Sequence, residues 1–176
     1  MNTTDIVNVI NAAMRAKCDG LNCRIRGLAK AVFVMDSEET GFPAIVTADN
    51  DRYVFIDDDY IFGTYHRLNA KTYSHDFKSG YGDSSKTICT FDMSIVGWGF
   101  IKHLSAEALE ALIISCIPKK DYQVVKTDFD AKRVSQGELS GIPYFIPEDA
   151  FLFRLNYTVK VPVKNECIEL DEIFNQ

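Results

Sequence analysis

Three consecutive aspartates, Asp57, Asp58 and Asp59, form the densest group of potential cation ligands in the sequence. Carboxylate oxygens bind Ca²⁺ and Mg²⁺, but adjacent carboxylates on an extended chain point to alternate sides. The following residues 60–63 also lack the spaced oxygen ligands of a calcium loop. We therefore interpret the triplet as a solvated acidic turn, with a cation site as the alternative, and predict no bound metal.

Thiols and imidazoles are the usual ligands of zinc, and the chain offers both. The candidates are His66, His75, His103, Cys18 and Cys23. The two cysteines straddle the predicted end of a helix, and the first two histidines fall in a predicted loop without a turn that would join them. The spacing therefore argues against a zinc site.

The remaining features that could do chemistry favour packing instead. Cys89 and Cys116 fall on predicted buried faces, whereas a nucleophilic thiol must be partly exposed. Gly97 and Gly99 flank Trp98, but no GxGxxG or GK[ST] pattern follows to form a phosphate-binding loop. We predict no catalytic residue and no cofactor, and we expect the chain not to be an enzyme.

The elements that must position any site are clearest in the C-terminal half. Alternation predicts a strand over Thr87–Ile95 that ends at Gly97, and a helix capped by Ser105 and stopped by Pro118 follows. A strand from about Tyr122 to Ala131 comes next, and then the longest alternating run, Phe151–Val163. We predict that the core is built on this last strand and, because proline cannot donate to a ladder, that Pro162 marks an edge.

The N-terminal half predicts a helix and three short strands. The helix is capped by Thr3 or Thr4, ends near Gly20 and buries one face, formed by Ile6, Val9, Ile10, Ala13 and Met14. Residues 21–30 show no clear period. Short β-rich runs at 31–35, 44–48 and 53–56, separated by turn signals, favour antiparallel pairing.

Composition describes an ordinary globular chain. It has 176 residues, of which 47% are hydrophobic, and a net charge of −6. We expect one domain over residues 1–176 with an α+β fold, in which two helices pack on a mainly antiparallel twisted sheet with long projecting loops. No block of basic residues favours nucleic-acid binding, and no apolar stretch predicts a membrane span, so we expect a soluble intracellular protein. The odd count of five cysteines favours a reducing compartment.

Two long segments, Thr64–Ser85 and Val134–Asp149, are predicted to be loops between strands. Loops of this length are usually functional, and apolar residues in a projecting loop predict a partner surface. The alternative for the second loop is that it folds back over its own sheet, and both remain open. The candidate interface residues are Phe42, Tyr81, Ile142, Tyr144, Phe145 and Ile146.

The order of the predicted elements resembles the tail-terminator and head–tail joining proteins of tailed bacteriophages. The most similar stretches are residues 109–118, 124–129 and 151–159. The resemblance implies a non-enzymatic virion protein, assembled in the host cytoplasm, that forms a homo-oligomeric ring, commonly six-membered. Its partners would be portal or adaptor and tail proteins, and DNA would pass through the lumen without sequence-specific binding.

Two other functions compete with this one. The first is a small soluble enzyme or ligand-binding α+β protein, with a site near Asp57–Asp59 and the histidines. The second is an adaptor that binds one partner through its aromatic loops. Only the phage-protein hypothesis requires a ring, so ring formation would distinguish it from both alternatives.

Overall fold

The structure is a computed structural model that describes residues 2–35, 41–76, 86–139 and 144–163. These residues form three helices and seven strands, which confirms the predicted α+β class with a mostly antiparallel sheet. In chain order the elements are α1 (Thr3–Lys17), β1 (Cys23–Met35), β2 (Gly41–Thr47), β3 (Arg52–Val54), β4 (Phe62–Asp76), β5 (Lys86–Phe100), α2 (Ala106–Ile114), β6 (Tyr122–Asp128), α3 (Ala131–Glu138) and β7 (Ala150–Val163).

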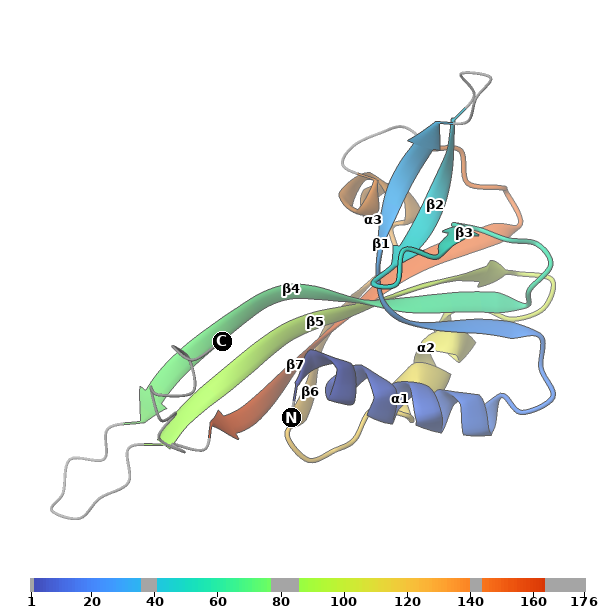
Figure 1. Cartoon of the computed structure of the whole chain (residues 1–176). Helices are drawn as coiled ribbons and strands as arrows, with labels where there is room; N and C mark the ends of the chain where they lie inside the picture. The colour runs from blue at the N-terminus through green and yellow to red at the C-terminus, as the bar shows by residue number, and fades with distance from the viewer. Residues whose placement is uncertain (1, 36–40, 77–85, 140–143, 164–176) are drawn as a thin grey trace, which may run out of the picture.

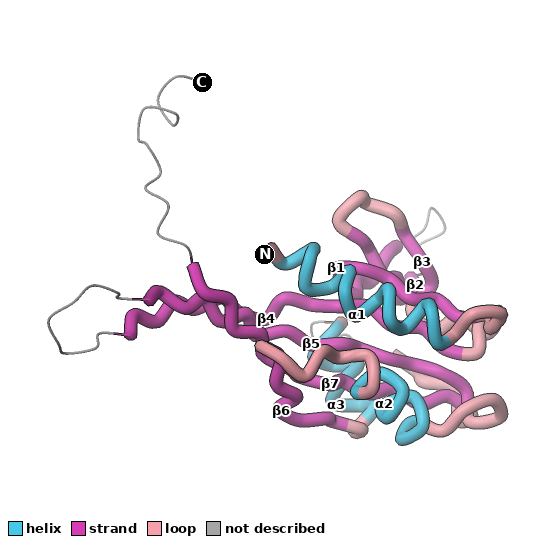
Figure 2. The backbone as a smooth tube through the Cα atoms, turned by 90° about the horizontal axis from the view of Figure 1, so that it is seen from below, coloured by secondary structure: helices cyan, strands magenta, loops and turns pink. Residues whose placement is uncertain are grey.

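The seven strands form one sheet in the order β3-β2-β1-β4-β5-β7-β6. All pairings are antiparallel except that of β1 with β4. Helices α1 and α2 cover one face, and α3 lies on the other (Figure 1). Beyond the body, the ends of β4, β5 and β7 continue as a three-stranded arm that extends past the N-terminal end of α1 (Figures 1 and 2). The arm comprises residues 70–76, 86–92 and 158–163.

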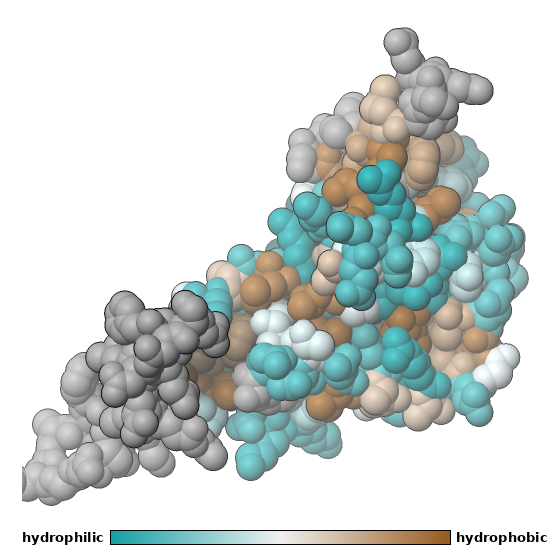
Figure 3. Space-filling model, in the orientation of Figure 1, coloured by the Kyte–Doolittle hydropathy of each residue, from teal (hydrophilic) through white to brown (hydrophobic). Residues whose placement is uncertain are grey.

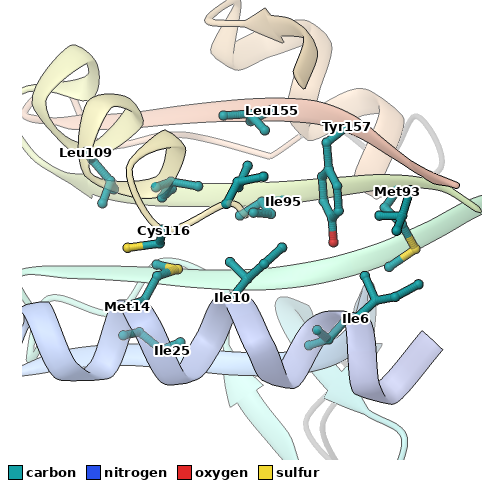
Figure 4. Close-up of a cluster of buried hydrophobic side chains, with 14 of the residues drawn as sticks. Ile6, Ile10, Met14, Ile25, Met93, Ile95, Leu109, Cys116, Leu155 and Tyr157 are labelled. Carbon is teal, nitrogen blue, oxygen red and sulfur yellow. The ribbon is translucent and has the colours of Figure 1, made fainter. Parts of the chain in front are cut away.

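The larger core lies between the sheet and helices α1 and α2, and Figure 4 shows its side chains. The alternating residues Phe151 to Val159 of β7 are buried in it, which confirms the predicted inward face as far as Val159, whereas Val163 at the end of the strand is 38% exposed. Burying each such side chain stabilises by about 1.5–3 kcal/mol before the cost of ordering the chain. From α1, the core takes Ile6, Val7, Ile10 and Met14.

The N-terminal helix begins one or two residues earlier than predicted, since Thr3 or Thr4 was the expected cap. Its N-cap is Asn2, whose side chain accepts from the Asp5 backbone N–H at 2.9 Å, while the Asp5 carboxylate accepts from the Asn2 backbone N–H. The predicted inward face was partly wrong, because Val9 is 46% exposed and Val7 and Asn11 are buried in its place. The N-cap of α2 is Ser105, as predicted.

A second core on the opposite face is covered by α3. It contains Trp98 of β5, Tyr65 of β4, Leu152 of β7 and Val134 of α3, all at most 1% exposed. The central strands therefore bury both faces, whereas the alternation of apolar and polar residues had predicted only one buried face. Helix α3 itself was not predicted, because its eight residues lie where we expected a strand end and a loop.

One predicted strand boundary was wrong for a reason that the packing supplies. Strand β5 does not end at Gly97 but runs to Phe100, paired with β7 throughout. A Cβ on Gly97 would lie 2.5 Å from the Phe153 ring, and one on Gly99 would lie 2.7 Å from the Phe151 ring. These glycines make room for aromatic rings on the neighbouring strand, so they continue the strand instead of breaking it.

The predicted loop over Thr64–Ser85 is for most of its length strand β4, which pairs with β5 from Phe62 to Asp76. It looked like a loop because the arm is exposed on both sides near Ala70 and Thr72, so apolar residues do not alternate there. Strand β1 likewise begins at Cys23, inside the region without clear period. Among the described residues no helix has the length and apolarity needed to cross a membrane.

Candidate interaction surface

Strands β1 and β4 separate after a short parallel pairing, and this leaves an open strand edge. β1 pairs with β4 only between Cys23–Leu28 and Phe62–His66, and its later residues pair only with β2. From Arg67 onward, β4 has β5 on one side and no strand of the described chain on the other. Its backbone N–H and C=O groups there are available to a further strand.

A groove of about 510 Å³ lies where the two strands part. Its walls are Leu28–Ala31 of β1, Val46–Ala48 at the end of β2, Arg67 and Leu68 of β4, and the end of α3 at Gly137 and Glu138. Most of the lining is apolar, with charge supplied by Lys30, Arg67 and Glu138.

The Glu138 carboxylate holds this region together. It accepts from the Tyr65 hydroxyl at 2.8 Å and from Arg67 Nη1 at 3.2 Å, and it also pairs with Arg154 Nη2. The Glu138 side chain is only 1% exposed. Burial, together with the neighbouring carboxylate, raises the pKa of Tyr65 well above its ordinary value. Two guanidinium groups share one carboxylate, so the cluster is an ion-pair network that links α3, β4 and β7. It is not an acid–base pair.

At the other end of the sheet, β6 forms a second open edge. It pairs with β7 on one side only, and no described strand lies beyond it. Val124, Val125 and the nearby Phe129 are 36%, 59% and 44% exposed. Within the described residues, free strand edges therefore lie on the short terminal strand β3, on the later part of β4 and on β6, and the last two are at opposite sides of the β4-β5-β7-β6 sheet.

The six predicted interface residues divide into three groups. Phe42 is 40% exposed near the end of the β1–β2 hairpin, where it pairs with Val34, and Figure 3 shows apolar residues on this hairpin. Phe145 is 77% exposed. Tyr144 and Ile146 instead pack partly against the second core, where the Tyr144 ring lies 6.2 Å from that of Phe55. Tyr81 and Ile142 lie outside the described residues.

The acidic triplet forms a compact turn, contrary to the extended chain that we assumed. One carboxylate oxygen from each of Asp57, Asp58 and Asp59 lies within 4.8 Å of the others, a spacing that a cation could use. Asp57, however, already binds Arg24 at 2.7 Å and accepts from the Asp59 backbone N–H. The Arg24 guanidinium in turn lies 4.0 Å from the centre of the Tyr60 ring. The turn is therefore tied to β1 by an ion pair, which gives the Asp57 carboxylate a structural role.

The histidines do not join this turn. His66 is fully buried under α1, where its Nε2 lies 2.9 Å from Asn11 Oδ1 and its Nδ1 lies 3.0 Å from the Tyr157 hydroxyl. Burial lowers the pKa of His66 to about 3, so the ring is neutral at ordinary pH. His103 is exposed in the turn after β5, and the side chain of His75 lies outside the described part. Sequence reasoning missed the partners of His66 because it placed this residue in a loop.

The described cysteines are all free thiols. Burial first, and then the neighbouring Cys23 thiol, raise the pKa of Cys18 to about 11, so this thiol is protonated and weakly nucleophilic. Cys89 and Cys116 are buried, as predicted.

Arg154 and Glu138 were not singled out from the sequence. The only signal was an arginine on the polar side of the most regular strand, and nothing marked its partner.

A comparison with models of known protein families gives no match, and neither does a comparison with curated proteins.

Proposed function

We propose that this chain is a non-enzymatic structural subunit that assembles head to tail into a closed ring, of the kind found at the head–tail junction or the tail end of tailed phages. The observation that carries the proposal is the pair of free strand edges on β4 and β6. They lie on opposite sides of one sheet, so the same contact can repeat from subunit to subunit.

A contact between two different surfaces of identical subunits forms a ring when the rotation between neighbours closes. In this ring, the β4 edge of one subunit pairs with the β6 edge of the next, and main-chain hydrogen bonds supply affinity. β4 is regular from Ala70 to Asp76, beyond the bulge near Asn69. β6 carries its own bulge at Val125. Bulges interrupt a ladder, so each edge suits only a partner that fits its shape.

Exposed apolar side chains supply the rest of the contact. Val125 and Phe129 flank the β6 edge, while Phe42 and Phe145 project elsewhere and suit contacts with portal or adaptor and tail proteins. Large exposed aromatic residues are common anchors of protein interfaces. The net charge of −6 fits a lumen through which DNA passes without being held by phosphate contacts.

The competing enzyme or ligand-binding hypothesis gains no support from the arrangement of its residues. Asp57 is engaged by Arg24, and His66 is enclosed between α1 and the sheet with both ring nitrogens bonded. These groups therefore do not converge on a common space that a substrate could enter.

The experiment is to measure the mass of the purified chain in solution over a range of concentrations, together with negative-stain imaging. We expect closed rings of several subunits, either alone or after addition of a portal or tail complex. Val125→Lys places a charge on the β6 edge and should abolish rings while the monomer keeps its unfolding midpoint. Val9→Lys is the matched control, because Val9 is 46% exposed on helix α1, which belongs to neither strand edge.

A chain that stays monomeric at high concentration, and also fails to join a portal or tail complex, would refute the proposal. Rings that survive Val125→Lys would show that assembly uses a surface other than the β6 edge.

A further inference from the structure

The arm carries a groove of about 380 Å³ on the same face as α1, beyond the end of that helix. It crosses all three strands, and its lining is Lys71 and Tyr73 of β4, Cys89 and Phe91 of β5, and residues 161–163 of β7. On the body, α1 covers this face of the sheet. On the arm no described element does so, as the view from below shows (Figure 2).

The groove is apolar, with one cation at its far side. Tyr73 is 57% exposed and Val163 is 38% exposed, although both lie next to the buried Cys89 and Phe91. The Lys71 ammonium group lies 5.1 Å from the centre of the Tyr73 ring and 5.3 Å from that of Phe91. An occupant of this groove therefore needs apolar side chains and at least one negative charge.

We infer that this groove is the docking site of residues 164–176 of the same chain; this does not rest on the proposed ring, although Lys71 and Tyr73 belong to the part of β4 whose edge the ring contact uses. Val163, the last residue of β7, lines the groove, so residues 164–176 are covalently attached at its edge. That segment has the required composition. Its apolar residues are Cys167, Ile168, Leu170, Ile173 and Phe174. Its acidic residues are Glu166, Glu169, Asp171 and Glu172.

Length and charge both fit this occupant. β7 and β4 are two strand spacings apart, about 10 Å, which an extended chain covers in about three or four residues. The thirteen residues 164–176 are therefore long enough to cross the groove, and their four acidic residues can supply the negative charge that Lys71 favours. Because the segment is covalently joined to one end of the groove, its effective concentration exceeds that of any free chain.

The experiment measures how fast a thiol in the groove reacts with a maleimide in the full-length chain. Tyr73→Cys is compared in two backgrounds, one with the native segment and one with Ile168→Asn and Leu170→Asn, and labelling at position 73 is read by peptide mass. We expect the native segment to slow labelling by about tenfold or more, which is the protection given by a modestly stable docked state. Circular dichroism verifies that both proteins are folded.

Ser74→Cys is the matched control, because adjacent residues of a strand point to opposite faces and Ser74 is exposed on the other side of the arm. Its labelling rate should be the same in both backgrounds. Lys71→Glu should remove most of the protection at position 73, and Glu169→Lys with Asp171→Lys should restore it.

Equal labelling of Tyr73→Cys in the two backgrounds would overturn the assignment. Protection that appears only as the protein concentration rises would assign the groove to a second copy, and would likewise overturn docking within one chain.

Discussion

The hydroxyl of Tyr157 lies 3.0 Å from Nδ1 of His66, so a side chain of β7 is bonded across β5 to a side chain of β4. The other ring nitrogen of His66 faces Asn11 Oδ1, and the Asn11 amide is oriented by its bond to the Arg26 carbonyl. Because Oδ1 can only accept, Nε2 carries the proton and Nδ1 accepts from Tyr157. Both nitrogens of the neutral ring are satisfied in this way, and the chain of bonds ties α1 to the sheet.

This arrangement predicts a loss of stability in acid. The pKa of His66 is about 3 in the folded protein, against about 6.5 in the unfolded chain. Between these values only the unfolded state binds the proton, so the free energy of unfolding falls as pH decreases from about 6.5 to 3, by up to about 1.4 kcal/mol per pH unit. His66→Gln should remove this contribution. Urea unfolding of both proteins at several pH values measures it.

The control for this prediction is His103→Gln, because His103 lies exposed in a turn. Carboxylates that titrate in the same range contribute equally to all three proteins and cancel in the comparison. Identical pH slopes in the native chain and in His66→Gln would mean that His66 takes up its proton as readily when folded as when unfolded.

A second prediction concerns the buried Glu138. Glu138→Ala leaves Arg154 without its carboxylate partner and removes the acceptor of the Tyr65 hydroxyl, and loss of one partner of a buried pair costs about 3 kcal/mol. Arg67 contributes less, because its side chain is 41% exposed and can be solvated. Denaturant unfolding measures the loss. Glu148→Ala, at an exposed position, should change stability by less than about 0.5 kcal/mol.

The third prediction tests why β5 continues through its glycines. Gly97→Ala places a methyl group against the Phe153 ring, and we expect a loss of about 1–3 kcal/mol from overpacking. Gly27→Ala is the matched strand control, because a Cβ there meets nothing within 4 Å. It should be neutral or slightly stabilising. Equal losses at the two positions would point to backbone conformation, not to the ring, as the reason for glycine.

Regular alternation predicted the elements that carry the larger core. The strand Phe151–Val163, the helix after Ser105 and the buried Cys89 and Cys116 are as expected, because one buried face imposes a period of two or 3.6. The edge expected at Pro162 is also present, since the pairing of β6 with β7 stops at Val159. A regular apolar period arises where an element buries one face only, and these elements do so.

The elements that were predicted wrongly are those that bury both faces or neither face. β4 is exposed on both faces along the arm, and it looked like a loop. The stretch Val96–Trp98 is buried on both faces, and its glycines looked like a stop. The joining of Glu138 to Arg67 and Arg154 depends on contacts between residues far apart in the chain, so no local pattern could reveal it. The contact of Tyr144 with Phe55 could not be predicted for the same reason, because the two residues are far apart in the sequence.

The last prediction separates residues of the fold from residues of the assembly, and it takes Tyr157→Asp as its reference. Tyr157 is fully buried, so this change encloses an unpaired carboxylate and leaves His66 Nδ1 without its donor. The expected cost is several kcal/mol, enough to reduce soluble expression of a marginally stable domain.

Phe145 and Tyr144 are neighbours in the chain, but the structure predicts different results for them. Phe145 is 77% exposed, so Phe145→Asp should leave the unfolding midpoint of the monomer nearly unchanged while weakening binding to a neighbour or partner, as loss of an aromatic anchor does. Tyr144 packs on Phe55 and the second core, so Tyr144→Asp should cost about 1–3 kcal/mol. Thermal unfolding of the two variants, beside Tyr157→Asp, measures the difference. If Phe145→Asp unfolds the isolated chain as badly as Tyr157→Asp does, Phe145 belongs to the core and its assignment to an interface is wrong.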